Sequence, residues 1–142
     1  MGVKIMWKFK TPGIPDEEFE RVDDVPITKE EVRVIQISKA RLKPGYTVYD
    51  IGCGSGSISV EAAFQIESAG KVYAVDFEPK AIELTKKNLE KFSFLIDSST
   101  ENRVSIKMVP ITIRPPDFIL LLHNSKISLV SPPVPPIKTA SA

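Results

Sequence analysis

The sequence contains little cysteine, little histidine and almost no net charge. One cysteine, Cys53, and one histidine, His123, stand among 142 residues, so no internal disulfide can form and no metal-ligand spacing exists. Lys and Arg number 19 and Asp and Glu number 18, which leaves a net charge of +1. Such a balance gives no field strong enough to draw the chain onto nucleic acid or an anionic membrane. We therefore predict no metal site, no nucleic-acid partner and no membrane partner.

The sequence also lacks a long apolar run near its start. The first ten residues alternate charge with bulk and contain neither a signal peptide nor a membrane span. A single cysteine fits a reducing compartment, so we expect a cytoplasmic protein. A chain of 142 residues with 42% hydrophobic content suits one domain with its own core.

Proline and acidic residues are distributed unevenly along the chain. The last 42 residues hold seven of the 12 prolines but only two of the 18 acids, which rules out long helices there. We divide the chain into a domain over residues 1–127 and a proline-rich, extended tail over 128–142. Within the domain, an irregular arm covers 1–25, a regular core covers 26–92, and short strands are expected in 93–127.

Helical and extended patterns alternate in the core. Hydrophobic periodicity predicts helices over 29–41, 58–68 and 79–92 and strands over 46–51 and 71–75. Thr28 is expected to cap the first helix. A helical turn is expected over 16–19, and weaker patterns indicate strands over 104–109 and 118–122. The order helix, strand, helix, strand, helix predicts an α/β fold with a parallel sheet.

Three alternating glycines follow the first predicted strand. Gly52, Gly54 and Gly56 stand where the carboxyl ends of parallel strands bind ligands. Asp76 lies 20 residues beyond Gly56 at the end of the second strand, where a carboxylate can accept hydrogen bonds from a ribose diol. With Asp50 two residues ahead of the first glycine, this pattern favours S-adenosylmethionine (SAM) as cofactor.

Two other interpretations of the glycines remain open. A nicotinamide dinucleotide site has the fingerprint Gly-x-Gly-x-x-Gly, which would require glycine where Ser57 stands. The glycines could also be ordinary turn residues. Among nearby side chains, Cys53 is interpreted as a small buried residue and His123 as structural. The aromatic residues of the arm, Trp7, Phe9 and Phe19, are expected to pack it against the domain.

Five segments of the chain combine into a distinctive pattern, namely Lys10–Phe19, Val25–Glu31, Asp50–Gly56, Ala74–Asp76 and Ala81–Leu89. The most restrictive part is the Thr-Pro-Gly-Ile-Pro-Asp motif of the arm. Over roughly residues 8–92 this pattern resembles the decarboxylating precorrin methyltransferases of cobalamin biosynthesis, which are class I SAM-dependent methyltransferases with a Rossmann-like fold.

The resemblance implies methylation at C15 of cobalt-precorrin-6B, a tetrapyrrole, with loss of carbon dioxide from the C12 acetate, in a homotetramer. The motif and the resemblance together place SAM against Thr28, Asp50, Gly52, Cys53, Gly54, Ser55, Gly56 and Asp76. The resemblance also implies that Pro12, Gly13, Ile14, Pro15 and Asp16 border the tetrapyrrole pocket. It identifies no catalytic side chain, because alignment of carbon and sulfur supplies most of the acceleration.

The resemblance stops near residue 92. Family members continue with an acidic stretch and a glycine-rich loop that this sequence does not contain, so we expect a fold truncated on its C-terminal side. We interpret the break as a frameshifted or truncated reading frame, which resequencing the coding DNA would test. Two other functions therefore stay open, a SAM-binding remnant without turnover and a methyltransferase acting on RNA or protein.

Overall fold

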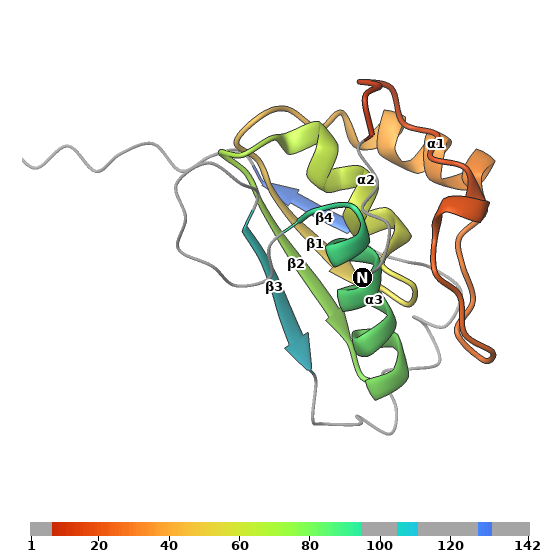
Figure 1. Cartoon of the computed structure of the whole chain (residues 1–142). Coiled ribbons are helices and arrows are strands. Elements are labelled where there is room, and N and C mark those ends of the chain that lie inside the picture. The colour runs from red at the N-terminus through yellow and green to blue at the C-terminus, as the bar shows by residue number, and fades with distance from the viewer. Residues whose placement is uncertain (1–6, 95–104, 111–127, 132–142) are drawn as a thin grey trace, which may run out of the picture.

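The computed structural model describes residues 7–94, 105–110 and 128–131 and forms an α/β arrangement (Figure 1). Its elements are, in chain order, η1 (Asp16–Glu18), α1 (Glu30–Ala40), β1 (Thr47–Ile51), α2 (Ser57–Ile66), β2 (Lys71–Asp76), α3 (Pro79–Lys91), β3 (Ser105–Pro110) and β4 (Ser128–Ser131). The predicted helical turn, helices and strands are confirmed to within two residues wherever the structure describes them. The strand expected over 118–122 lies outside the described residues.

The strands form one sheet in the order β3-β2-β1-β4. Strands β1, β2 and β3 run parallel, as the alternating elements predicted, and Asp50 is paired with Ala74 in the register. Strand β4 runs antiparallel to β1 and pairs Val130 with Val48. Residues 128–131, which we assigned to the tail, therefore belong to the sheet. Their pairing satisfies backbone groups that an open edge of β1 would expose.

Helix α1 begins one residue later than a Thr28 cap would require. Its N-cap is Lys29, which makes no side-chain capping hydrogen bond, so the prediction of Thr28 as the cap is wrong. The carbonyl of Thr28 instead accepts a hydrogen bond from the guanidinium of Arg33. A buried side chain from the first turn of the helix thus bonds the segment that leads into it.

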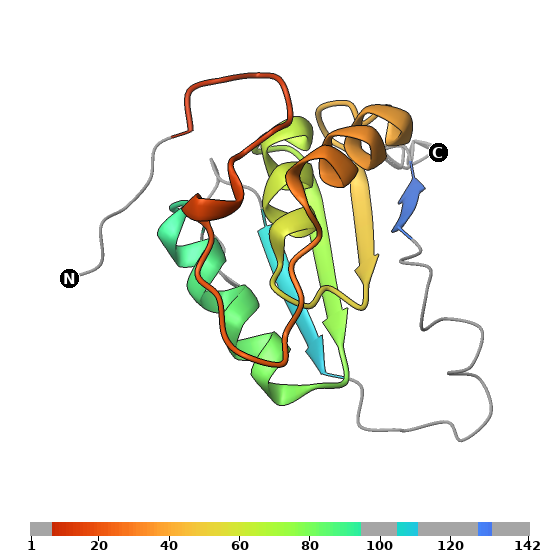
Figure 2. The ribbon, with the colours of Figure 1, turned by 90° about the vertical axis from the view of Figure 1, so that its right-hand side faces the viewer.

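All three α-helices lie on one face of the sheet (Figures 1 and 2). Val48 and Val72 point toward them and are buried in the same apolar cluster as Ile58 and Leu89. On the opposite face, Tyr49 and Tyr73 stack at a ring-centroid distance of 4.9 Å, and Tyr49 is 38% exposed. The described core therefore lies between the sheet and one helical layer.

The arm crosses this helical layer before the chain enters α1 (Figure 2). Phe19 is buried and its ring lies 5.1 Å from that of Phe92 at the end of α3. Trp7 is partly buried against the same cluster, whereas Phe9 is 65% exposed and contacts Trp7 edge-on. Packing of the arm by its aromatic residues is confirmed for Phe19 and Trp7 and is wrong for Phe9.

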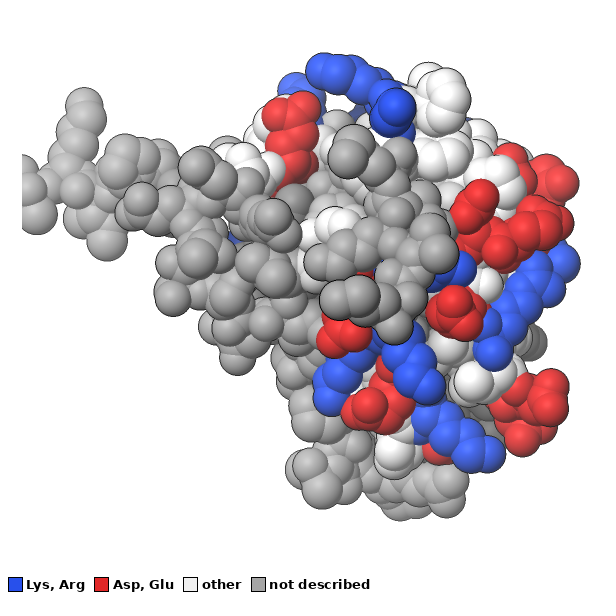
Figure 3. All heavy atoms as spheres, in the orientation of Figure 1, with Lys and Arg blue, Asp and Glu red and all other residues white. Residues whose placement is uncertain are grey.

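On the face that Figure 3 shows, the described Lys and Arg side chains lie interspersed with Asp and Glu side chains. None of the helices in the described part of the chain is both long and apolar enough to cross a membrane.

Candidate cofactor site

The glycine loop, residues 52–56, connects the end of β1 to the first turn of α2. Gly52, Gly54 and Gly56 have φ angles of 77°, 56° and 77°, a conformation that side chains with a Cβ atom disfavour. The amides of Gly52 and Cys53 donate to the carbonyl of Val75 at 2.8 and 3.0 Å. This backbone pairing anchors the loop to the end of β2.

The outer two glycines of the loop have different neighbours. A Cβ atom on Gly56 would lie 2.7 Å from Cγ2 of Thr85, so this glycine is required by the packing of α3. A Cβ atom on Gly52 would meet no atom of the described residues within 4 Å. We expected glycine at all three positions to leave space for a cofactor. The structure has open space at Gly52, whereas Gly56 has to be glycine because Thr85 leaves no room for a side chain.

Asp76 lies directly beside the loop, as its position at the end of the second strand predicted. One carboxylate oxygen accepts from the amide of Gly54 at 2.9 Å, and the other accepts from the amide of Glu78 at 3.0 Å. The residue is 8% exposed. These two hydrogen bonds hold Asp76 in place. Each carboxylate oxygen can still accept a second hydrogen bond, so the side chain could also bind a ligand hydroxyl.

The remaining predicted contacts of the loop are buried. Asp50 is fully buried and accepts a 2.7 Å hydrogen bond from the hydroxyl of Ser59 in α2. Cys53 is also fully buried, which confirms its interpretation as a small buried residue. The hydroxyls of Ser55 and Ser57 are buried and have no hydrogen-bond partner among the described residues. They leave polar atoms available next to the loop.

Helix α3 holds the loop from outside through two polar side chains. Thr85 donates to the carbonyl of Gly54 at 2.9 Å, and Asn88 donates to the carbonyl of Ser55 at 2.8 Å. Both side chains are fully buried. The sequence analysis did not identify them, although two polar residues three positions apart on the apolar face of α3 are a usable signal.

A second buried polar cluster surrounds Arg33 of α1. Arg33 is fully buried, and its guanidinium lies 2.6 Å from Asp16 and 3.3 Å from Glu61. It also donates to the carbonyls of Ile14 and Thr28. One side chain thus holds both ends of the arm segment that includes η1. Thr28, predicted to contact the cofactor, lies at the far end of that segment.

Glu61 of α2 belongs to the same cluster and contacts the backbone of the arm. Its carboxylate accepts from the amide of Gly13 at 3.1 Å and from the amide of Ile14 at 3.0 Å. The side chain is 1% exposed. The sequence analysis missed both Arg33 and Glu61. The signal for Glu61 was a lone charge in a helix whose other residues are mostly apolar or small.

The pKa of Asp16 is lowered from its usual value. Burial acts to raise it, but hydrogen bonds from Arg33 and Lys29, reinforced by their positive charges, outweigh that effect. The ionised form of Asp16 is therefore stabilised where it meets the guanidinium.

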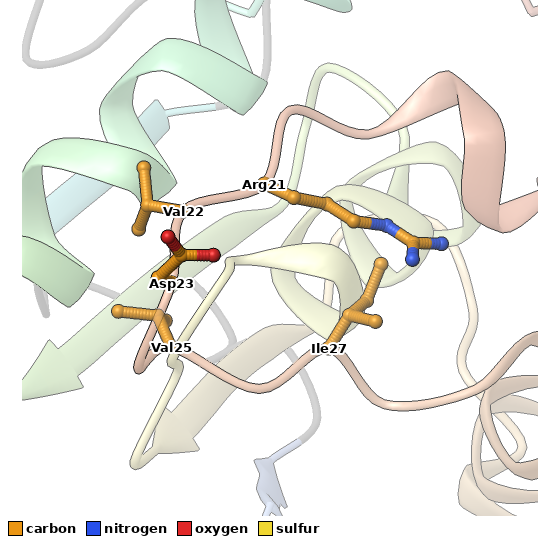
Figure 4. A pocket seen from close by; sticks show the side chains of 5 residues that line it. All are labelled: Arg21, Val22, Asp23, Val25 and Ile27. Carbon is orange, nitrogen blue, oxygen red and sulfur yellow. The ribbon is translucent and has the colours of Figure 1, made fainter.

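The arm residues predicted to border the substrate pocket lie within or beside this cluster. Ile14 and Asp16 are buried, and Pro12, Gly13 and Pro15 are half-buried. Open space lies farther along the arm. A hollow of about 540 Å³ is lined by Arg21, Val22, Asp23, Val25 and Ile27 (Figure 4).

A second hollow, of about 650 Å³, adjoins the first, because Val22 and Asp23 line both. Its other wall is the outer face of α3. The residues that complete it are Asp24, Pro79, Lys80, Glu83, Leu84 and Lys87.

A parallel sheet with a glycine loop after β1 and an acid at the end of β2 defines a Rossmann-like fold of the SAM-dependent methyltransferase class. The family model described as "Precorrin methyltransferase domain" matches residues 18–121, and the chain belongs to this family. The match continues past residue 92, where we expected the resemblance to stop, and includes β3.

Individual proteins that resemble the chain have names that fit this family. A protein of Saccharolobus solfataricus named "Probable cobalt-precorrin-6B C(15)-methyltransferase (decarboxylating)" is 53% identical over 89 residues, which are 63% of this chain and 45% of the relative. A solved precorrin-6y C5,15-methyltransferase of Geobacter metallireducens is 32% identical with a TM-score of 0.57, covering 70% of this chain and 47% of its own.

A solved precorrin 8W decarboxylase of Methanobacterium thermoautotrophicum is 31% identical with a TM-score of 0.57, covering 68% of this chain and 47% of its own. The chain thus spans less than half the length of these relatives.

Proposed function

We propose that the glycine loop binds SAM and that Asp76 accepts hydrogen bonds from its ribose. The observation that carries this proposal is the 2.9 Å hydrogen bond from the amide of Gly54 to Asp76, which brings the loop and the acid into one site. The open space at Gly52 and the buried hydroxyls of Ser55 and Ser57 fit a ligand with both apolar and polar parts.

Other residues predicted to contact the cofactor support the site from behind. Asp50 positions α2 through Ser59, and Cys53 fills space under the loop. When bound, SAM supplies a methyl group on a sulfonium, which carries its own leaving group. The contribution of this chain is then to bind and orient the cofactor, and no side chain is assigned as a general base.

We further propose that the methyl acceptor is a tetrapyrrole of the cobalt-precorrin-6B type, methylated at C15 with loss of carbon dioxide from the C12 acetate. The names of the relatives support this substrate. The arm would border it, with the segment from Pro12 to Asp16 fixed by Arg33 and Glu61 and the stretch 21–27 lining the hollow. Because the matched residues cover less than half of each of these relatives, this chain would carry the cofactor-binding part of such an enzyme.

Calorimetric titration of SAM and of S-adenosylhomocysteine tests the cofactor site. We expect saturable binding to the wild type and at least roughly tenfold weaker binding to Asp76→Ala, because a hydrogen bond to a charged group contributes about 1.5–3 kcal/mol. Glu90→Ala is the matched control, since it removes an exposed carboxylate of α3 and should bind as the wild type does. Equal affinity of all three proteins would contradict the assignment of Asp76.

A turnover assay separates the open functions. Cobalt-precorrin-6B with SAM should give a methylated product and carbon dioxide in equal amounts if the chain is an active methyltransferase of this type. SAM binding without either product would indicate a binding remnant, and methylation of RNA or protein alone would indicate another substrate. The homotetramer implied by the family is proposed for the active form, and sedimentation equilibrium tests it.

A further inference from the structure

The side-chain amide of Asn88 contacts the arm and the glycine loop at the same time. Its oxygen accepts from the backbone amide of Glu20 at 2.7 Å. Its nitrogen donates to the carbonyl of Glu20 at 3.2 Å and to the carbonyl of Ser55 at 2.8 Å. Because Asn88 is fully buried, water cannot readily replace any of these three hydrogen bonds.

The two ends of this link are at functionally distinct places. Ser55 belongs to the loop proposed to bind SAM, whereas Glu20 directly precedes Arg21, the first residue lining the hollow. A shift of Glu20 would therefore move the start of the hollow's wall. Helix α3 also contacts each side separately, through Thr85 to the loop at 2.9 Å and through Lys91 to the Glu20 side chain at 3.2 Å.

We propose that Asn88 is a positioning residue that couples the two sites, so that cofactor bound on the glycine loop holds the arm at Glu20 and fixes the wall of the hollow. This inference rests on the proposed SAM site. The physical reason is that a ligand restricting the loop also restricts the Ser55 carbonyl. The Asn88 nitrogen that bonds this carbonyl belongs to the same planar amide group that is hydrogen-bonded to the backbone of Glu20. Restricting the motion of the Ser55 carbonyl therefore also restricts the motion of the arm at Glu20.

The coupling is measurable as hydrogen exchange of the Glu20 backbone amide by NMR, with and without saturating S-adenosylhomocysteine. In the wild type we expect the ligand to slow this exchange by about fivefold or more, which is the lower range of coupling between sites. Asn88→Asp retains an acceptor for the Glu20 amide but loses both donated hydrogen bonds. In this variant, a saturating ligand should leave the Glu20 exchange rate unchanged.

Three further variants make the test specific. Asn88→Ala removes all three hydrogen bonds without placing a charge against two carbonyls, so it serves if Asn88→Asp does not fold. Thr85→Val removes the hydroxyl that holds the Gly54 carbonyl and should weaken binding while a saturating ligand still protects Glu20. Lys91→Ala removes only the exposed ion pair to Glu20 and should retain both the affinity and the protection.

The outcomes separate this inference from the cofactor assignment. Slowed exchange in the wild type, lost in each Asn88 variant that folds and retained in the two controls, supports the coupling. Binding of S-adenosylhomocysteine to the wild type with no change at Glu20 overturns the coupling and leaves the cofactor site intact. Protection that persists in an Asn88 variant that folds also overturns it. No binding to the wild type overturns the cofactor assignment, and the coupling with it.

Discussion

The glycine loop and the arm are held in place in different ways. The loop is fixed by positive φ angles, by hydrogen bonds to Val75 and by neutral side chains of α3 that bond its carbonyls. The arm has little regular structure and is fixed by two buried charges, Arg33 and Glu61, that bond its backbone. The glycine loop can therefore be identified in the sequence from the spacing of its glycines. The arm depends instead on buried charged side chains, and removing one of them leaves its partner's charge buried without compensation.

The largest effect is expected from removing the charge at the centre of the arm. Arg33→Met should lower the free energy of unfolding by about 3 kcal/mol or more, because Glu61 and Asp16 would lose their buried partner. Urea denaturation followed by circular dichroism measures this.

Lys29→Met is the matched control for Arg33→Met, because the Lys29 side chain is 65% exposed and lies 3.2 Å from the same Asp16. It should cost under about 1 kcal/mol. Similar losses in the two variants would mean that burial of Arg33 does not distinguish it from a surface partner.

The loop should respond unequally to alanine at its two outer glycines. Gly56→Ala combines a left-handed backbone, costing roughly 1–2 kcal/mol, with overlap against Thr85, which adds about 1–3 kcal/mol. Gly52→Ala carries only the backbone cost, because its Cβ atom would face open space. Denaturation curves of the two variants measure the difference.

Ligand titration and a rescue variant sharpen the comparison of Gly56 with Gly52. If SAM occupies the space at Gly52, Gly52→Ala should lose more affinity than its small stability cost explains. Combining Gly56→Ala with Thr85→Ser, which removes the methyl group nearest the added Cβ atom, should recover part of the lost stability. Equal stability of the two single variants would show that overlap with Thr85 adds nothing to the cost at Gly56.

The sequence was sufficient to predict the glycine loop and its acid because each follows directly from a strand with a clear local pattern, whereas the contacts of Thr85 and Asn88 with the loop were not predicted. Alternating glycines after a β-branched strand, and an acid after the next strand, predicted that the loop and the acid share one edge of the sheet, and the structure joins them by the hydrogen bond from Gly54 to Asp76. The parallel order of β1, β2 and β3 followed from alternating periodicities in the same way. These elements depend on residues close together in sequence, whose patterns are shared by many proteins.

The contacts of the arm could not be predicted in this way. Arg33 and Glu61 are 28 positions apart, and Asn88 reaches Glu20 across 68 positions. No periodicity or motif links such pairs, because their partners are backbone groups in irregular segments that any residue could supply. The position of β4 was missed for a related reason, since a four-residue strand beside several prolines has too short a pattern to distinguish it from a tail.

The smallest expected effect is a pH-dependent loss of stability when Asp16 of the arm is replaced. Because the folded state lowers the pKa of Asp16 below 3.8, its ionised form stabilises the fold above that value, and this contribution is lost as pH falls below 3.8 toward the folded pKa. Asp16→Asn should therefore be less stable than the wild type at neutral pH, and the difference should shrink at acid pH. Unfolding free energies measured on both sides of pH 3.8 provide the comparison. A difference that is constant with pH would mean that the charge of Asp16 does not help to hold the arm, and that the uncharged hydrogen bond to Arg33 is enough.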